Sequence, residues 1–143
     1  MIDRKSTSGY AAFVLGNPVT WATRKQTIVA SSSFDAEYIA ASEATKEAIW
    51  LKALIEDFDI KNDDSVPIYE DNQSVIKTVD SPQINKRSKH IVIKYMFLRD
   101  NVQKNVISFQ YVNSANQTAD ILTKALPSPS FLKHREALHV LRS

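Results

Sequence analysis

Residues 35–58 read DAEYIAASEATKEAIWLKALIEDF and carry the strongest helical pattern in the chain. Apolar side chains recur there every three or four positions, which places them along one face of a helix. The members of this stripe are Ala41, Ala44, Ala48, Leu51, Ile55 and Phe58. One further step of four toward the N-terminus reaches Glu37, so this acid lies in the first turn, on the face that we expect to meet the core. A helix dipole favours an acid near its N-terminal end but does not choose the side, so Glu37 is a candidate functional residue.

A second acid, Asp71, lies in the run Ile68-Tyr-Glu-Asp-Asn-Gln-Ser74. The sequence predicts a strand over 66–71 and a short helix over 72–79, so Asp71 stands where a strand ends and a helix starts. Ligands of open α/β sheets gather at such strand ends. Asp is also a favoured helix N-cap, and both interpretations stay open.

A third acid, Asp120, lies in the run Asn116-Gln-Thr-Ala-Asp-Ile-Leu-Thr-Lys124. Ser114-Ala-Asn-Gln117 matches a capping box, which predicts a helix that carries Asp120. The structural alternative for this acid is an ion pair with Lys124, four residues on. Acids that converge repel one another unless a cation lies between them, and Mg²⁺ prefers oxygen ligands. The three acids together are therefore a candidate magnesium site.

The remaining pattern supplies strands and helices around these acids. A glycine-bounded apolar run over 9–16 and an alternating run over 19–24 predict a hairpin with its turn at Asn17-Pro18. The other expected elements are a strand at 66–71, helices at 72–79 and 91–104, a strand at 106–112, the helix with Asp120, and a last helix at 131–141 after breaks at Pro127 and Pro129. A hairpin followed by strands that alternate with helices indicates an α/β (α+β) fold in which helices pack on a mixed sheet.

Length and composition narrow the class of protein. With 143 residues, the chain is expected to be a single domain over 1–143. It has no cysteine, which excludes disulfides and thiolate metal sites. No apolar run is long enough to cross a bilayer, and the N-terminal residues lack the apolar segment of a signal peptide. We therefore expect a protein that is neither secreted nor bound in a membrane.

Positive charge is concentrated in one stretch. No acid occurs between Ser81 and Arg99, and the basic residues there are Lys86, Arg87, Lys89, His90, Lys94 and Arg99. Such a local excess can meet the phosphates of a nucleic acid. The alternative is a solvated basic loop that leads into a helix.

Taken together, these segments resemble the ribonuclease H domain of Ty1/copia-type retrotransposon Pol polyproteins. The likeness extends over nearly the whole chain, in order and at the expected spacings. The segments that carry it are Asp3–Tyr10, Ala36–Tyr38, Lys46–Leu51, Ile68–Ser74, Lys86–Ile91, Lys94-Tyr95, Gln117–Lys124 and Leu126-Pro127.

The resemblance implies a five-stranded mixed sheet flanked by helices. It also implies a site in which four carboxylates hold two Mg²⁺ ions and cut the RNA strand of an RNA–DNA hybrid. Glu37, Asp71 and Asp120 match three of these acids by motif, as catalytic and metal-binding residues. Asp35 and Glu70 are neighbouring acids to which the resemblance gives no such role.

The fourth acid of the family pattern matches no residue here. It lies in the family's first, central strand, and the chain starts within the connection that follows this strand, to which Asp3 belongs. We therefore expect a domain truncated at its N-terminus, a sheet without its central strand, an incomplete two-ion site, and weak or no activity of this chain alone.

The partners follow from the same resemblance. An RNA–DNA hybrid is the expected substrate, and the reverse transcriptase portion of the same polyprotein is a further expected partner. The candidate nucleic-acid-binding residues are Asn72, Gln73, Lys86, Arg87, Lys89, His90, Lys94 and Gln117. The resemblance implies a cytoplasmic retrotransposon particle or the nucleus as location. A catalytically inactive, nucleic-acid-binding remnant of a retrotransposon is the alternative function.

Overall fold

The computed structural model describes residues 5–61, 63–81 and 88–140. Its elements follow the order that the sequence predicts. They are β1 (Thr7–Val14), β2 (Asn17–Lys25), α1 (Ser33–Asp57), β3 (Val66–Glu70), α2 (Gln73–Asp80), α3 (Lys89–Gln103), β4 (Ile107–Tyr111), the 3₁₀ helices η1 (Ser114–Asn116) and η2 (Thr118–Leu122), and α4 (Ser128–Ala137). The α+β class is confirmed.

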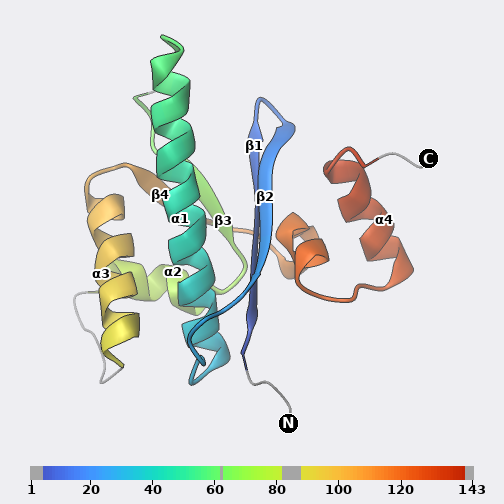
Figure 1. Ribbon diagram of the computed structural model, residues 1–143, viewed down its shortest axis with the longest axis horizontal. Helices are drawn as coiled ribbons and strands as arrows, with labels where there is room; N and C mark the ends of the chain where they lie inside the picture. The colour runs from blue at the N-terminus through green and yellow to red at the C-terminus, as the bar shows by residue number, and fades with distance from the viewer. Residues whose placement is uncertain (1–4, 62, 82–87, 141–143) are drawn as a thin grey trace.

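The strands form two separate two-stranded sheets, rather than one sheet, in the part of the chain that the structure describes. β1 and β2 pair antiparallel, with a bulge between Ala12 and Phe13. β3 and β4 pair parallel, since α2 and α3 form the crossover between them. Figure 1 shows α3, α1, the β1–β2 hairpin and α4 in succession across the molecule, with β3 and β4 behind α1. α1 packs against both sheets through its contacts with β1 and β3.

The hairpin turn lies earlier than predicted. Leu15 and Gly16 form it, with φ of 51° and 79°, and β2 already starts at Asn17. The prediction of a turn at Asn17-Pro18 is therefore wrong. Two successive residues with positive φ match the twist of a hairpin, and Pro18 fits into the strand because it lies at the bulge opposite Phe13.

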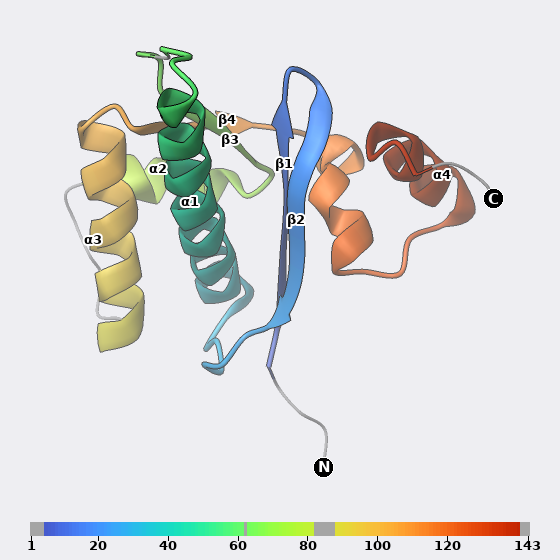
Figure 2. The ribbon, with the colours of Figure 1, turned by 45° about the horizontal axis from the view of Figure 1, so that its top comes forward.

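The core lies between α1, α2, α3 and β4. Its buried members are Tyr38, Ala41, Ala48, Val75, Val79, Tyr95, Leu98 and Ile107. On α1, the predicted stripe is correct at Ala41 and Ala48 but wrong at its C-terminal end, where Phe58 is 71% exposed. Figure 2 shows this end of α1 reaching past the neighbouring helices. Thr45 is buried on the same face because its hydroxyl donates to the carbonyl of Ala41, at 2.8 Å, so the α-helix itself satisfies the polar group.

The C-terminal part differs from the prediction in two ways. Asp120 lies in the 3₁₀ helix η2 rather than in an α-helix. The last helix, α4, starts at Ser128 and not at Phe131, because Pro129 occupies its first turn, where its missing N–H is not needed. None of the helices in the described part of the chain has the length and apolarity that a bilayer crossing would require.

Candidate functional site

Three acids converge where α1 passes the end of β3. Glu37, Glu70 and Asp71 each offer a carboxylate oxygen, and these oxygens lie within 4.8 Å of one another. Glu70 is the last residue of β3 and is buried, whereas Glu37 and Asp71 are half-buried. The structure thus brings together Glu37 and Asp71, which the sequence predicts, and adds Glu70. We call these three residues the carboxylate cluster.

The start of α1 fixes the direction of Glu37. The hydroxyl of Ser32 caps the helix by accepting the backbone N–H of Asp35, at 3.1 Å. Asp35 is itself buried, and its carboxylate accepts a hydrogen bond from Ser31. The first turn therefore holds Asp35 toward the preceding loop, while Glu37, two residues on, faces the end of β3.

Glu70 is the buried acid of the cluster. Burial, together with the charges of Glu37 and Asp71, raises its pKa to about 8, against the lowering effect of a hydrogen bond from the backbone N–H of Asn72. That N–H donates to Glu70 Oε1 at 2.9 Å. Glu70 is therefore largely protonated at neutral pH unless a cation binds nearby.

Glu37 shows the same crowding of negative charge. Burial raises its pKa, the charges of Asp71 and Asp120 raise it too, and the charge of Lys124 lowers it. Asp120 and Lys124 thus lie close enough to act on Glu37, although Asp120 is not one of the acids within 4.8 Å. The structure places all three predicted acids in one electrostatic neighbourhood.

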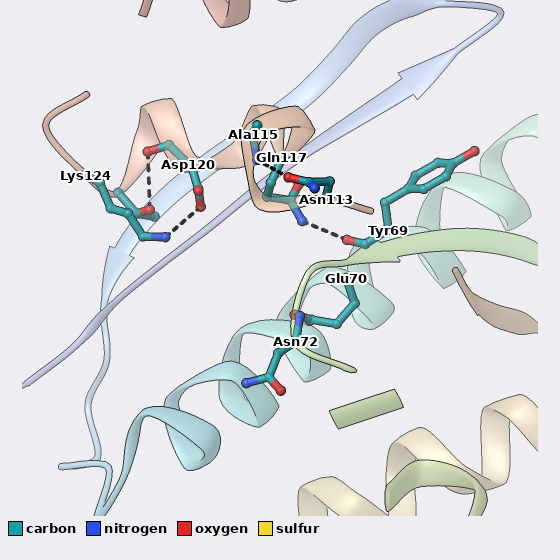
Figure 3. Close-up of polar contacts among 9 residues, drawn as sticks. Tyr69, Glu70, Asn72, Asn113, Ala115, Gln117, Asp120 and Lys124 are labelled. Atoms are coloured by element: carbon teal, nitrogen blue, oxygen red, sulfur yellow. Dashed lines mark hydrogen bonds and ion pairs between the residues drawn. The ribbon is translucent and has the colours of Figure 1, made fainter. Parts of the chain in front are cut away.

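Asp120 forms the ion pair that the sequence offers as its alternative. Lys124 Nζ lies 3.0 Å from Asp120 Oδ1, and Asp120 is the better shielded of the two, with side-chain exposures of 57% for Lys124 and 17% for Asp120. Burial lowers the pKa of Lys124, but Asp120, followed by Asp71 and Glu37, outweighs this effect and raises it. Figure 3 shows the pair at the left and Glu70 and Asn72 at the end of β3, with Gln117 drawn between these two groups.

Side-chain contacts hold the Asp120 segment in place. The amide of Gln117 donates to the carbonyl of Tyr69 on β3, at 3.0 Å. The hydroxyl of Thr23 on β2 donates to the carbonyl of Leu122, at 2.9 Å. The segment 117–122 therefore links the two sheets.

The predicted nucleic-acid-binding residues have mixed surroundings. Asn72 caps α2, since its side chain accepts the N–H groups of Ser74 and Val75, and the amide nitrogen of Gln117 is engaged as described. Gln73 is exposed at the start of α2, and Lys89 and His90 are exposed at the start of α3. Lys94 is half-buried, and its pKa is lowered by burial and by the charge of Lys46, against the charge of Glu43. Lys86 and Arg87 lie outside the described residues.

Glu70 is the site residue that reasoning from the sequence left out. Its signal is the alternation of β3, in which Val66 and Ile68 pack against the core. Glu70 lies two residues after Ile68, so it belongs to the same, inward face. An acid at an inward position of a strand marks a buried charge that needs a partner.

Comparison with known proteins shows that the chain is similar to a part of retrotransposon Pol polyproteins. The chain is 34% identical over 129 residues, 90% of its length, to "Retrovirus-related Pol polyprotein from transposon TNT 1-94" of Nicotiana tabacum, covering 10% of that protein. It is 32% identical over 140 residues, 98% of its length, to the RE1 Pol polyprotein of Arabidopsis thaliana, again covering 10%. Its homologues are the Pol polyproteins of copia-type retrotransposons.

The chain spans about a tenth of the length of these Pol polyproteins. The homology alone therefore relates the chain to these polyproteins but does not identify an activity. A shorter match, 54% identical over 49 residues, covers 34% of the chain and 34% of "Secreted RxLR effector protein 161" of Plasmopara viticola. No family model and no solved structure matches the chain.

Proposed function

We propose that this part of a copia-type Pol polyprotein is a ribonuclease H domain, which hydrolyses the RNA strand of RNA–DNA hybrids with Mg²⁺. The observation that carries the proposal is the meeting of Glu37 and Asp71, from α1 and from the end of β3, within 4.8 Å. These are two of the acids that the motif resemblance implies. Asp120, the third, acts electrostatically on Glu37 from η2.

The donor set fits a hard divalent ion. Every side chain of the carboxylate cluster offers oxygen, which Mg²⁺ prefers. Burial, and after it the charges of neighbouring acids, raises the pKa of Glu37 and of Glu70, and a bound cation would favour their ionised forms. Glu37, Asp71 and Asp120 would hold the ion, with Glu70 within reach of it.

Bound Mg²⁺ would supply Lewis-acid stabilisation of phosphate oxygens and a more acidic water. The protein's own residues prepare that environment. Glu37 and Asp71 present carboxylates from rigid elements, and the Asn72 N–H fixes the direction of Glu70. Lys124 restrains Asp120 through their ion pair. A side chain held by such contacts loses less entropy when a ligand binds.

A cleavage assay tests the proposal directly. The chain is incubated with a hybrid labelled on its RNA strand, in Mg²⁺ or in excess chelator, and thermal unfolding is followed in the same two buffers. We expect Mg²⁺ to raise the melting temperature and to support at most weak cleavage by this chain alone, and Asp71→Asn to abolish both effects. Asp63→Asn, in an exposed loop, is the matched control and should change neither. An unchanged response of Asp71→Asn would contradict the proposal.

A second candidate is a nucleic-acid-binding remnant without catalysis. It is favoured by the position of Asp120, which is not among the acids whose oxygens lie within 4.8 Å of one another and which is already paired with Lys124. This function predicts hybrid binding with steep salt dependence and no cleavage. Lys89→Ala combined with Lys94→Ala should then reduce the salt slope by about 1–2, at roughly 0.7–0.9 per phosphate contact. Cleavage by the parent chain would exclude this candidate.

A further inference from the structure

The end of η2 and the residue that follows it approach the hairpin closely at Gly9. A Cβ atom at this position would lie 2.5 Å from Thr123 Cγ2 and 3.3 Å from Leu122 Cβ. Carbon atoms do not approach one another to 2.5 Å without a large repulsion, because contacts are optimal near 3.5–4.0 Å. Glycine inside a strand often marks such a close approach of another segment. Position 9 therefore requires glycine because a side chain would not fit beside Thr123, and not because of its backbone conformation.

The same rung of the hairpin makes a second contact with the segment. Gly9 pairs with Thr23 across β1 and β2, and the Thr23 hydroxyl donates to the carbonyl of Leu122. Side chains at paired positions share one face of a sheet. Residues 122–123 are thus seated on a small area formed by Gly9 and Thr23.

Residue 123 is tied in turn to Asp120. The backbone N–H of Thr123 donates to the carbonyl of Asp120 at 3.1 Å, and that of Lys124 donates to the same carbonyl at 3.0 Å. The Thr123 hydroxyl also donates to it, at 3.4 Å. A displacement of Thr123 is therefore transmitted to Asp120 and Lys124.

We propose that Gly9 is a positioning residue for the Asp120–Lys124 pair, because its lack of a side chain lets Thr123 seat against the hairpin and so sets how far that pair lies from Glu37 and Asp71. The inference rests on the proposed function, since it assigns Asp120 to the same metal site. It deepens that function by adding a residue that touches none of the acids.

The chain offers a complementary pair of substitutions. Gly9→Ala adds the one methyl group that meets Thr123 Cγ2. Thr123→Ser removes that Cγ2 and keeps the hydroxyl that bonds to Asp120. Gly16→Ala is the control for the loss of a hairpin glycine, because a Cβ there meets nothing within 4 Å. The Gly16 variant loses stability through its positive φ but should not move Asp120.

Three measurements test the inference on the parent, on Gly9→Ala, on Gly16→Ala and on the double variant Gly9→Ala with Thr123→Ser. In the metal-free state, NMR follows the resonances of Asp120 and Lys124. With Mn²⁺ as the probe, paramagnetic broadening of the Asp120 carboxyl is compared with that of Asp71. We expect Gly9→Ala to shift the resonances, to weaken the broadening of Asp120 relative to Asp71, and to slow hybrid cleavage about tenfold to a hundredfold, as misplacements near 1 Å do. Gly9→Ala combined with Thr123→Ser should restore the parent's values.

The outcomes separate this inference from the proposed function. If the parent neither binds Mn²⁺ nor cleaves, the proposed function fails, but the metal-free resonances still decide the role of Gly9. Unmoved Asp120 and Lys124 resonances in Gly9→Ala overturn the inference, as does a shift that Thr123→Ser does not reverse. If Gly9→Ala does not fold, we expect the double variant to fold and to give the parent's spectrum. A double variant that does not do so also overturns the inference.

Discussion

Gln117 donates a hydrogen bond from its side-chain amide to the backbone carbonyl of Tyr69, across 3.0 Å. Tyr69 immediately precedes Glu70, and Gln117 immediately precedes η2, which carries Asp120. This hydrogen bond therefore connects the segment that carries Asp120 to β3, the strand that ends at Glu70 of the carboxylate cluster. Figure 3 shows this bond as a dashed line between Gln117 and the carbonyl of Tyr69.

Replacing Gln117 with Met should loosen this connection. The variant loses one hydrogen bond at a half-buried position, which costs about 0.5–1 kcal/mol, and urea denaturation measures the loss. Amide hydrogen exchange should accelerate in residues 118–124 and not in the core helices. Gln110→Met, the same change at an exposed position of β4, serves as the control and should leave both quantities unchanged. Equal effects of the two substitutions would count against a positioning role for Gln117.

Lys124→Met should increase the electrostatic repulsion between Glu37 and the neighbouring acids. Lys124 lowers the pKa of Glu37, so its loss should raise that pKa and destabilise the metal-free protein at neutral pH by about 1 kcal/mol, the upper end for surface pairs. Mg²⁺ should then raise the melting temperature more in the variant than in the parent. Lys104→Met is well matched, because Lys104 pairs with Asp100 at 2.7 Å with both side chains more than half exposed. A Mg²⁺ response that is the same in all three proteins would refute this role of Lys124.

Glu70 should make stability depend on pH in a predictable direction. Its pKa rises from 4.5 to about 8 on folding, so the folded state holds a proton that the unfolded state releases. Stability from this group is fully present below about pH 4.5 and is lost as the pH rises to about 8. Denaturation midpoints of Glu70→Gln should lack that decline, and the variant should be the more stable protein at pH 8.

Glu56→Gln, in the exposed last turn of α1, controls for the removal of one acid. Saturating Mg²⁺ should flatten the decline in the parent, since a bound cation favours ionised Glu70. If the midpoints of the parent and of Glu70→Gln fell in parallel from pH 5 to pH 8, the buried acid would not be the origin of the dependence.

Truncation of the buried Leu98 should lower the free energy of unfolding far more than truncation of the exposed Leu15. Leu98 is 0% exposed and Leu15 is 97% exposed. Leu98→Ala should cost about 2–5 kcal/mol, through lost apolar burial and the cavity left behind. Leu15→Ala makes the same chemical change in the hairpin turn and should cost less than about 0.5 kcal/mol. Similar unfolding free energies for the two variants would show that the core described here is not the one that stabilises the protein.

The sequence was a good guide wherever a local pattern acts alone. The spacing of apolar residues predicted α1 and placed Glu37 on the helix face that meets β3. The pattern of a short strand followed by a helix placed Asp71 where β3 ends. The i,i+4 spacing offered the ion pair of Asp120 with Lys124 as the structural alternative for this acid, and the structure contains that pair. The hairpin turn was misplaced because Leu15 adopts a positive φ, which its residue type does not signal.

The sequence by itself determined the order of the elements and the position of each acid on its own element, since helix and strand periods are set by neighbours in the chain. Only the tertiary structure decided that Glu70 joins Glu37 and Asp71, that the strands form two sheets, and that Thr123 seats against Gly9. These outcomes depend on how surfaces from distant parts of the chain fit together, and the approach of two backbones to contact distance leaves no periodic signal in either segment.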